Sequence, residues 1–420
     1  MLRLTVRALA RRWPELLAWY LAGWAARLML IQFAGWAGST NSLIGLSLLP
    51  LAVLARLASY IGMFLVLRSE MTRYEQIESV VERTGGVGAP SFLSSWASTV
   101  GAALVPFFVI YAAWGLTAED GRAYTLSALN QTDFGADSAQ VTPLDTPFTW
   151  QTVTIVVVAF VLRRVLAHFA DRLPRWVGII STYLEAVWIF IALAFIGDLL
   201  AGIPEWLATR RMFAWAVDGW GQLRSEFRVV EWLGDALQWT SVQLGNVVFQ
   251  PLAWLALASI VLAGALPLAA RRRSVRMRRA RASFGRQWSR LGPRTRRILM
   301  LPVTGILERW QPVATALRLI WGAGPAALGV YVLAFAVLTV GTSWLQTALY
   351  HAWGPHEAGW WLAWDQPLSL LVGVLTFPVQ ICLVAAAFDR CLRALDARTT
   401  DAEAVNVLAG ADTEDSATRR

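Results

Sequence analysis

The sequence is short of charge and of the residues on which most soluble enzymes rely. Only 15% of its residues are Asp, Glu, Lys or Arg, whereas a soluble chain carries about a quarter. It contains no lysine, so all 37 basic residues are arginines, a bias typical of GC-rich bacterial coding sequence. So little charge in a chain of this length argues against an ordinary soluble domain.

Cysteine and catalytic motifs are equally scarce. Cys382 and Cys391 lie nine positions apart, one inside an apolar run and one just past its basic end. This spacing offers neither a disulfide framework nor a paired-cysteine metal site, so we interpret both as reduced thiols. The sequence also lacks HExxH, GxSxG and phosphate-loop motifs. We therefore expect no cofactor.

Long apolar segments are what the sequence has instead. Hydrophobic residues make up 56% of the chain and gather in runs separated by short polar stretches. A helix needs about 20 predominantly apolar residues to cross a bilayer. The pattern predicts an all-α, polytopic membrane bundle with about eight transmembrane helices and additional interfacial amphipathic helices, forming one domain over residues 1–394. The predicted spans lie near 16–36, 43–67, 98–117, 147–164, 177–200, 246–270, 324–346 and 366–388. The fourth is the weakest, because its apolar part is short.

The distribution of arginine predicts the orientation. With the N-terminus inside, thirty arginines fall in cytoplasmic segments and five in outer loops. Positive residues are retained on the cytoplasmic side of membrane proteins. Both termini are therefore expected inside, in a multi-pass protein of the plasma membrane, which in a bacterium is the inner, cytoplasmic membrane.

The most biased stretch is the predicted cytoplasmic loop 271–297, with twelve arginines and no acid. Its simplest role is to fix topology. It is also expected to bind anionic inner-leaflet headgroups, at about 1 kcal/mol per nearby arginine. We interpret the basic charge in this way rather than as a nucleic-acid surface. The acidic tail, residues 395–420, is expected without fixed structure. The arginines proposed for lipid contact are Arg271, Arg272, Arg273, Arg276, Arg278 and Arg279.

Two outer loops differ in character. The loop near 118–146 is rich in acids, whereas the segment 201–245 is rich in tryptophan, with apolar residues at three-to-four spacing. Such a pattern suits helices lying flat on the outer leaflet, but also helices packed on the protein's own spans. The sequence leaves both possibilities open. The tryptophans are Trp206, Trp215, Trp220, Trp232 and Trp239.

Three charged residues fall well inside predicted spans, away from the ends: Arg27, Arg56 and Glu185. Counted from the cytoplasmic ends, they lie within about three residues of one another in depth, or ~5 Å. A central arginine costs at least about 2.5–3.5 kcal/mol to insert, so both need partners or water. We expect all three to face the bundle interior, with Glu185 neutralising at least one arginine. The remaining positive charge would suit an anionic substrate.

A second cluster lies in the last predicted outer loop and contains His351, His356, Glu357 and Asp365. Imidazole and carboxylate groups can hold zinc or carry out acid–base chemistry. However, Gly354 and Pro355 separate the two histidines, so no helical pair of ligands is formed. A solvated loop that joins two spans explains the same residues.

Three functional hypotheses follow. The first is a transport or lipid-handling, permease-like membrane component with an intramembrane anion-friendly site at Arg27, Arg56 and Glu185. The second is a non-catalytic scaffold or accessory subunit, bound to a partner subunit, whose buried charges fix helix packing. The third is an outward-facing membrane enzyme that uses His351 and its neighbours.

Overall fold

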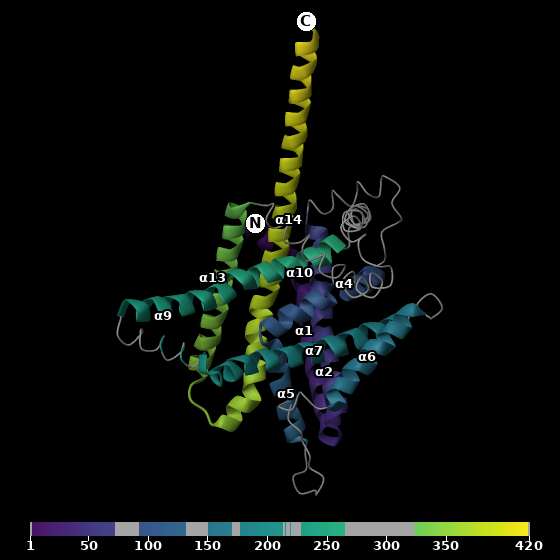
Figure 1. Ribbon diagram of the computed structural model, residues 1–420, viewed down its shortest axis with the longest axis vertical. Helices are drawn as coiled ribbons and strands as arrows, with labels where there is room; N and C mark the ends of the chain where they lie inside the picture. The colour runs from purple at the N-terminus through teal and green to yellow at the C-terminus, as the bar shows by residue number, and fades with distance from the viewer. Residues whose placement is uncertain are drawn as a thin grey trace. The chain divides into compact units, whose positions relative to one another are not determined.

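The protein is almost entirely α-helical wherever its computed structural model describes it (Figure 1). The described residues are 2–71, 92–131, 150–169, 177–212, 215, 219, 228–264 and 324–418. No strand occurs within these ranges. The arginine-rich loop 271–297 lies outside them, so its proposed lipid contacts remain predictions.

Five helices within the described ranges are long and apolar enough to cross a membrane, as a helical membrane bundle requires. They cover Leu2–Thr40, Ser42–Glu70, Val177–Gly197, Pro325–Trp353 and Ala358–Arg393. The shorter apolar helices Ala103–Ala113 and Val247–Leu262 fall in the third and sixth predicted spans. The fourth predicted span coincides with helix α6, Trp150–His168, whose apolar part is short. The count of eight and the orientation therefore remain predictions.

The chain forms two compact units. One consists of Met1–Tyr20, Ile61–Ala102 and Gln250–Arg420, and the other of Leu21–Tyr60 and Ala103–Phe249. We call them the C-terminal unit and the central unit. Neither is continuous in sequence, because helices α1 (Leu2–Thr40) and α2 (Ser42–Leu67) contribute to both.

In the C-terminal unit, helix α14 (Ala358–Thr418) packs against α10 (Gln250–Gly264) and α13 (Pro325–Trp353). Buried aromatic and aliphatic side chains fill the contact, and the Tyr331 hydroxyl donates to the Pro251 carbonyl oxygen at 2.8 Å. Helix α14 continues through Thr418, although the tail was expected without regular structure. Its many alanines, the best helix formers, outweigh the polar composition that suggested disorder.

In the central unit, α1 and α2 form a tight hairpin. Only Asn41 separates them, and its side-chain oxygen accepts a hydrogen bond from the Leu43 amide at 3.0 Å, which caps the start of α2. This agrees with the very short outer connection that the sequence indicates. Helix α6 packs along α7 (Val177–Ala208) in the same unit.

The third predicted span is broken, which the sequence did not reveal. Helix α4 runs from Phe92 to Ala113 and a second helix, α5, from Leu116 to Asn130, where an acidic outer loop was expected. Between them Gly115 has a φ of +71°, a left-handed conformation that glycine adopts without steric cost. The part of the predicted outer loop that α5 covers is therefore helical.

Helix α5 packs closely on the α1–α2 hairpin because glycines face it. A Cβ on Gly35 would collide with Ser127, and a Cβ on Gly38 or Gly45 would collide with Tyr124. The Ser127 hydroxyl also donates to Gln32 Oε1 at 2.8 Å. Small residues permit this kind of close helix approach within membranes.

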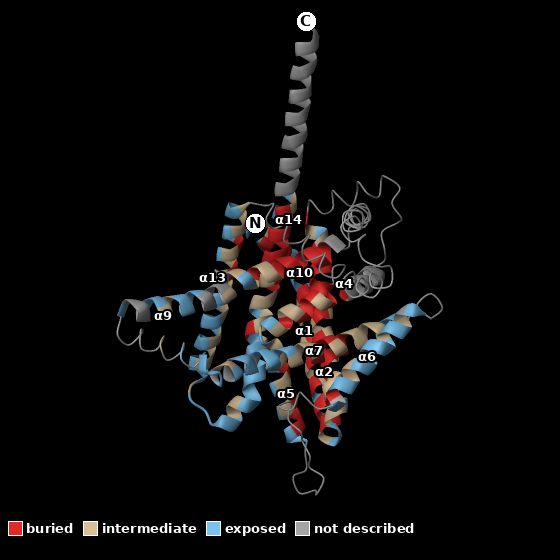
Figure 2. Cartoon of the chain, viewed as in Figure 1, coloured by how far each residue is buried: buried red, intermediate tan, exposed pale blue. Residues whose placement is uncertain are grey.

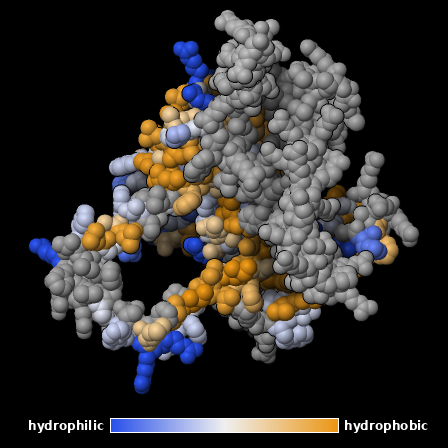
Figure 3. Space-filling view, turned by 45° about the horizontal axis from the view of Figure 1, so that its top comes forward, coloured by the Kyte–Doolittle hydropathy of each residue, from blue (hydrophilic) through white to orange (hydrophobic). Residues whose placement is uncertain are grey.

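Much of the remaining helical surface is apolar and exposed. Helices α6, α9 (Arg228–Gln243) and α13 are exposed along much of their length (Figure 2). On the face drawn in Figure 3, hydrophobic side chains cover broad areas and hydrophilic ones lie at projecting ends. Four tryptophans of the segment 201–245 are 56–79% exposed, so they are not buried among the described residues, and both interpretations of this segment remain predictions. They are Trp206, Trp215, Trp232 and Trp239; Trp220 lies outside the described residues.

The glycine contacts make a testable prediction about the hairpin. In Gly45→Ala, the new methyl group would meet the backbone of Gly38 and Ala34, so α1 and α2 must separate. We expect a loss of about 1–3 kcal/mol of stability, measured by thermal unfolding in detergent. Gly341→Ala on α13 is the matched control, because nothing lies within 4 Å of its added Cβ. Equal destabilisation by both substitutions would contradict the close packing.

Candidate functional site

The two intramembrane arginines lie in the central unit, beside the break between α4 and α5. Arg27 is buried, and its Nε donates to Asp120 Oδ1 at 2.8 Å. Its Nη2 pairs with the same oxygen and with Glu119 Oε1, the latter at 3.1 Å. Asp120 is completely buried. Arg27 is therefore held by two consecutive carboxylates at the start of α5.

Arg56 joins the same network through Tyr111 of α4. Its Nη1 donates to the Tyr111 hydroxyl at 2.8 Å, and that hydroxyl donates to Asp120 Oδ2 at 2.5 Å. The guanidinium carbon of Arg56 lies 5.6 Å from the centre of the Tyr111 ring, within the range of a cation–π interaction. Its Nη2 lies 3.9 Å from Glu119 Oε1. The result is one connected group of side chains from α1, α2, α4 and α5.

The contacts along α1 place α5 beside the C-terminal half of that helix. Asp120 meets Arg27, Ser127 meets Gln32, and Tyr124 lies against Gly38. From Arg27 to Gly38 is about 16 Å along a helix. Because Arg27 is near the middle of its predicted span, the break before α5 lies near mid-depth.

The charges of this network balance, which corrects two expectations. Arg27 and Arg56 face two carboxylates rather than one, so no net positive charge remains among these four groups. Glu185 is not their partner, because it forms its ion pair with Arg163 of α6 at 3.1 Å. Residue counting along a span gives depth but not the direction in which a side chain points. Glu185 was therefore placed at the right depth and assigned the wrong partner.

One side of the network is buried, and the other side is accessible at the surface of the protein. Asp120 is inaccessible and the Arg27 side chain is 6% exposed, but the Glu119 side chain is 51% exposed. A half-exposed carboxylate beside the middle of a predicted span would be costly to leave against lipid, so we expect water or polar protein next to Glu119. Irregular backbone at membrane depth likewise occurs where it is buried in protein or lines an aqueous cavity.

The cluster in the outer connection between α13 and α14 does not converge on one point. His351 Nδ1 lies 2.8 Å from its own helix's Thr347 carbonyl oxygen, and His356 stacks on Trp360 with 4.1 Å between ring centres. Asp365 accepts a hydrogen bond from Tyr350. Within the described ranges, which include Glu357, no three His, Cys, Asp or Glu side chains lie close enough to share a metal ion.

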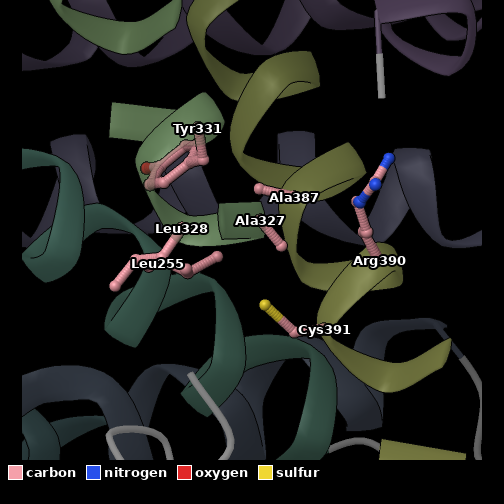
Figure 4. A pocket seen from close by; sticks show the side chains of 7 residues that line it. All are labelled: Leu255, Ala327, Leu328, Tyr331, Ala387, Arg390 and Cys391. Carbon is pink, nitrogen blue, oxygen red and sulfur yellow. The ribbon is translucent and has the colours of Figure 1, made fainter. Parts of the chain in front are cut away.

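A small cavity in the C-terminal unit offers no alternative site. Its volume is about 10 Å³, close to the smallest space that holds one water. Figure 4 shows that the Cys391 side chain reaches into it while the Arg390 side chain extends away from it. It is too small for a substrate.

Sequence reasoning missed Glu119, Asp120 and Tyr111. One signal was available: two consecutive acids follow a glycine at the end of an apolar run, in a chain with two unpaired intramembrane arginines. Because an arginine inside a membrane needs a partner, acids next to such a glycine are candidates even when they look like the start of a loop.

The ion pair between Arg27 and Asp120 predicts strong energetic coupling. Arg27→Gln and Asp120→Asn should each cost about 3–5 kcal/mol of stability, because each leaves an uncompensated buried charge. The double variant should recover part of that loss. Unfolding free energies of the purified variants in detergent provide the test.

The matched control is Glu185→Gln combined with Arg27→Gln. The two residues share no ion pair, so their effects should add to within about 0.5 kcal/mol. If Arg27→Gln and Asp120→Asn were equally additive, the proposed pairing would be wrong.

Comparison with known proteins adds no family to this description. No protein-family model, no curated protein and no solved structure matches the chain. What stands is a helical membrane protein with a balanced charged network at a break in one of its helices.

Proposed function

We propose that this chain is a permease-like membrane component in which the break between α4 and α5 lines an aqueous crevice. One observation carries the proposal: Glu119 is half exposed while it contacts Arg27 and Arg56 near mid-depth. A pathway for a polar solute needs such a polar site inside the membrane, reachable from water.

The broken helix gives the proposal a physical basis. A continuous helix satisfies its own backbone groups and offers a ligand only side chains. A break leaves the ends of two half-helices beside the charged groups, the arrangement by which discontinuous helices form solute sites in transporters. Gly115 supplies the break, and Glu119 and Asp120 follow within the first turns of α5.

The scaffold hypothesis is the second candidate, and the charge balance favours it. A network with two arginines and two carboxylates can fix the packing of four helices without any ligand. Under that hypothesis the exposed face of Glu119 would be covered by a partner subunit rather than by water. Lipid handling keeps its support from the exposed tryptophans of the outer segment.

Access of water to Glu119 separates the two candidates. In a variant with Cys382 and Cys391 replaced by alanine, Glu119→Cys should react with a charged, membrane-impermeant thiol reagent. The reaction needs the thiolate, which forms in water and is suppressed in apolar surroundings. Reactivity is followed by mass spectrometry on protein in lipid vesicles.

Val157→Cys provides the control, because Val157 is 53% exposed on the apolar face of α6 and should face lipid. We expect the thiol at 119 to react much faster than the thiol at 157. Equal, slow reaction at both positions would reject the aqueous crevice and leave the scaffold hypothesis.

A further inference from the structure

The two arginines of the network are held very differently. Arg27 donates two hydrogen bonds to Asp120 and a third to Glu119. Arg56 donates one to the Tyr111 hydroxyl, and its nearest carboxylate oxygen in the network, on Glu119, is 3.9 Å away, beyond hydrogen-bond distance. Arg56 also has the more accessible side chain, 21% exposed against 6% for Arg27.

Glu119 is the exchangeable member of the network. A single oxygen, Oε1, serves both arginines, at 3.1 Å from Arg27 Nη2 and 3.9 Å from Arg56 Nη2. Asp120 is enclosed and accepts hydrogen bonds on both of its oxygens. An oxyanion that approached from the exposed side would therefore compete with Glu119, not with Asp120, for Arg56.

Charge balance determines what must accompany such an oxyanion. The network is neutral as it stands, and an added anion would leave one unpaired negative charge in a largely buried site, which is costly. Protonation of Glu119 removes that charge. The two arginines would then be matched by Asp120 and by the ligand.

We propose that Arg56 binds the carboxylate or phosphodiester group of a singly charged ligand together with one proton, which Glu119 takes up. This rests on the permease-like function above, because the ligand must reach Glu119 through water. The proton comes from solvent and ends on a Glu119 carboxylate oxygen, ligand oxygens replace Glu119 Oε1 beside Arg56, and no covalent bond between ligand and protein forms or breaks. A guanidinium can hold both oxygens of either group.

The groups around Glu119 are consistent with this assignment. The described charged or titratable side chains that interact with it are Arg27 from α1 and Arg56 and Tyr60 from α2, with Asp120 beside it on α5. Asp120 is occupied by Arg27 and by Tyr111. Glu119 is thus the carboxylate with room for the proton.

Ligand binding at different pH tests the coupling. Thermal unfolding of the wild type in detergent is measured with sodium acetate or with short-chain phosphatidylglycerol, against sodium chloride at equal ionic strength. Both probes keep one negative charge between about pH 6 and pH 8. Where Glu119 is ionised in the free protein, coupling to one proton lowers the apparent affinity about tenfold per pH unit. In Glu119→Gln, which mimics the protonated side chain, the affinity should not depend on pH.

Two further variants make the outcome specific. Arg56→Gln should abolish binding of the probe, whereas Glu185→Gln, which removes a carboxylate from a separate ion pair, should keep the wild-type pH dependence. Stabilisation by acetate supports a small soluble carboxylate as ligand, and stabilisation by phosphatidylglycerol alone supports a lipid headgroup.

Affinity that is independent of pH in the wild type would overturn the proposal. So would the absence of binding in both the wild type and Glu119→Gln. If either result accompanied fast labelling at position 119, the aqueous crevice would stand and only the anion–proton coupling would fail.

Discussion

The ion pair between Arg27 and Asp120 is the interaction on which the central unit depends. A guanidinium in the middle of an apolar helix is tolerated only when a partner or water replaces its hydration. Asp120 meets that need from the first turns of α5, and it can do so only because α4 ends at Ala113 and Gly115 turns the chain. The broken span, the burial of Asp120 and the packing of α5 on the α1–α2 hairpin are consequences of one electrostatic requirement.

The fold class could be predicted from composition, whereas the break could not. Long apolar runs are sufficient to identify membrane helices, and each predicted span overlaps a helix of the structure. Hydropathy, however, averages over many residues, so a helix such as α5, with Glu119, Asp120 and Arg122 among its first residues, looks like a loop. Tyr124 of this helix fits closely against Gly38 and Gly45 of the α1–α2 hairpin. Such a contact between distant parts of the chain cannot be recognised from hydropathy.

The two arginines of the site could be predicted from the sequence, whereas their partners could not. Arg27 and Arg56 stand out because charge is expensive inside a bilayer, and the structure brings them to one network. Their partners Tyr111, Glu119 and Asp120 lie 55 to 93 residues away in sequence. Both acids fall outside the predicted spans, so depth along the chain could not identify them. Glu185 shows the converse: its depth matched, but it faces Arg163. To identify the partner of Glu185, one must know how α7 is rotated about its axis, and a single sequence does not give that rotation.

Cross-linking can show whether α5 lies along the half of the α1–α2 hairpin next to Asn41. In a cysteine-free background, Gln32→Cys and Ser127→Cys are combined and treated with a short bifunctional thiol reagent in native membranes. The two side chains are in hydrogen-bond contact, so we expect rapid intramolecular cross-linking. Gln32→Cys with Ala118→Cys should not cross-link, because residue 118 lies about 13 Å from residue 127 along α5. Failure of the first pair to cross-link, or equal reaction of both pairs, would contradict the packing of α5 on α1.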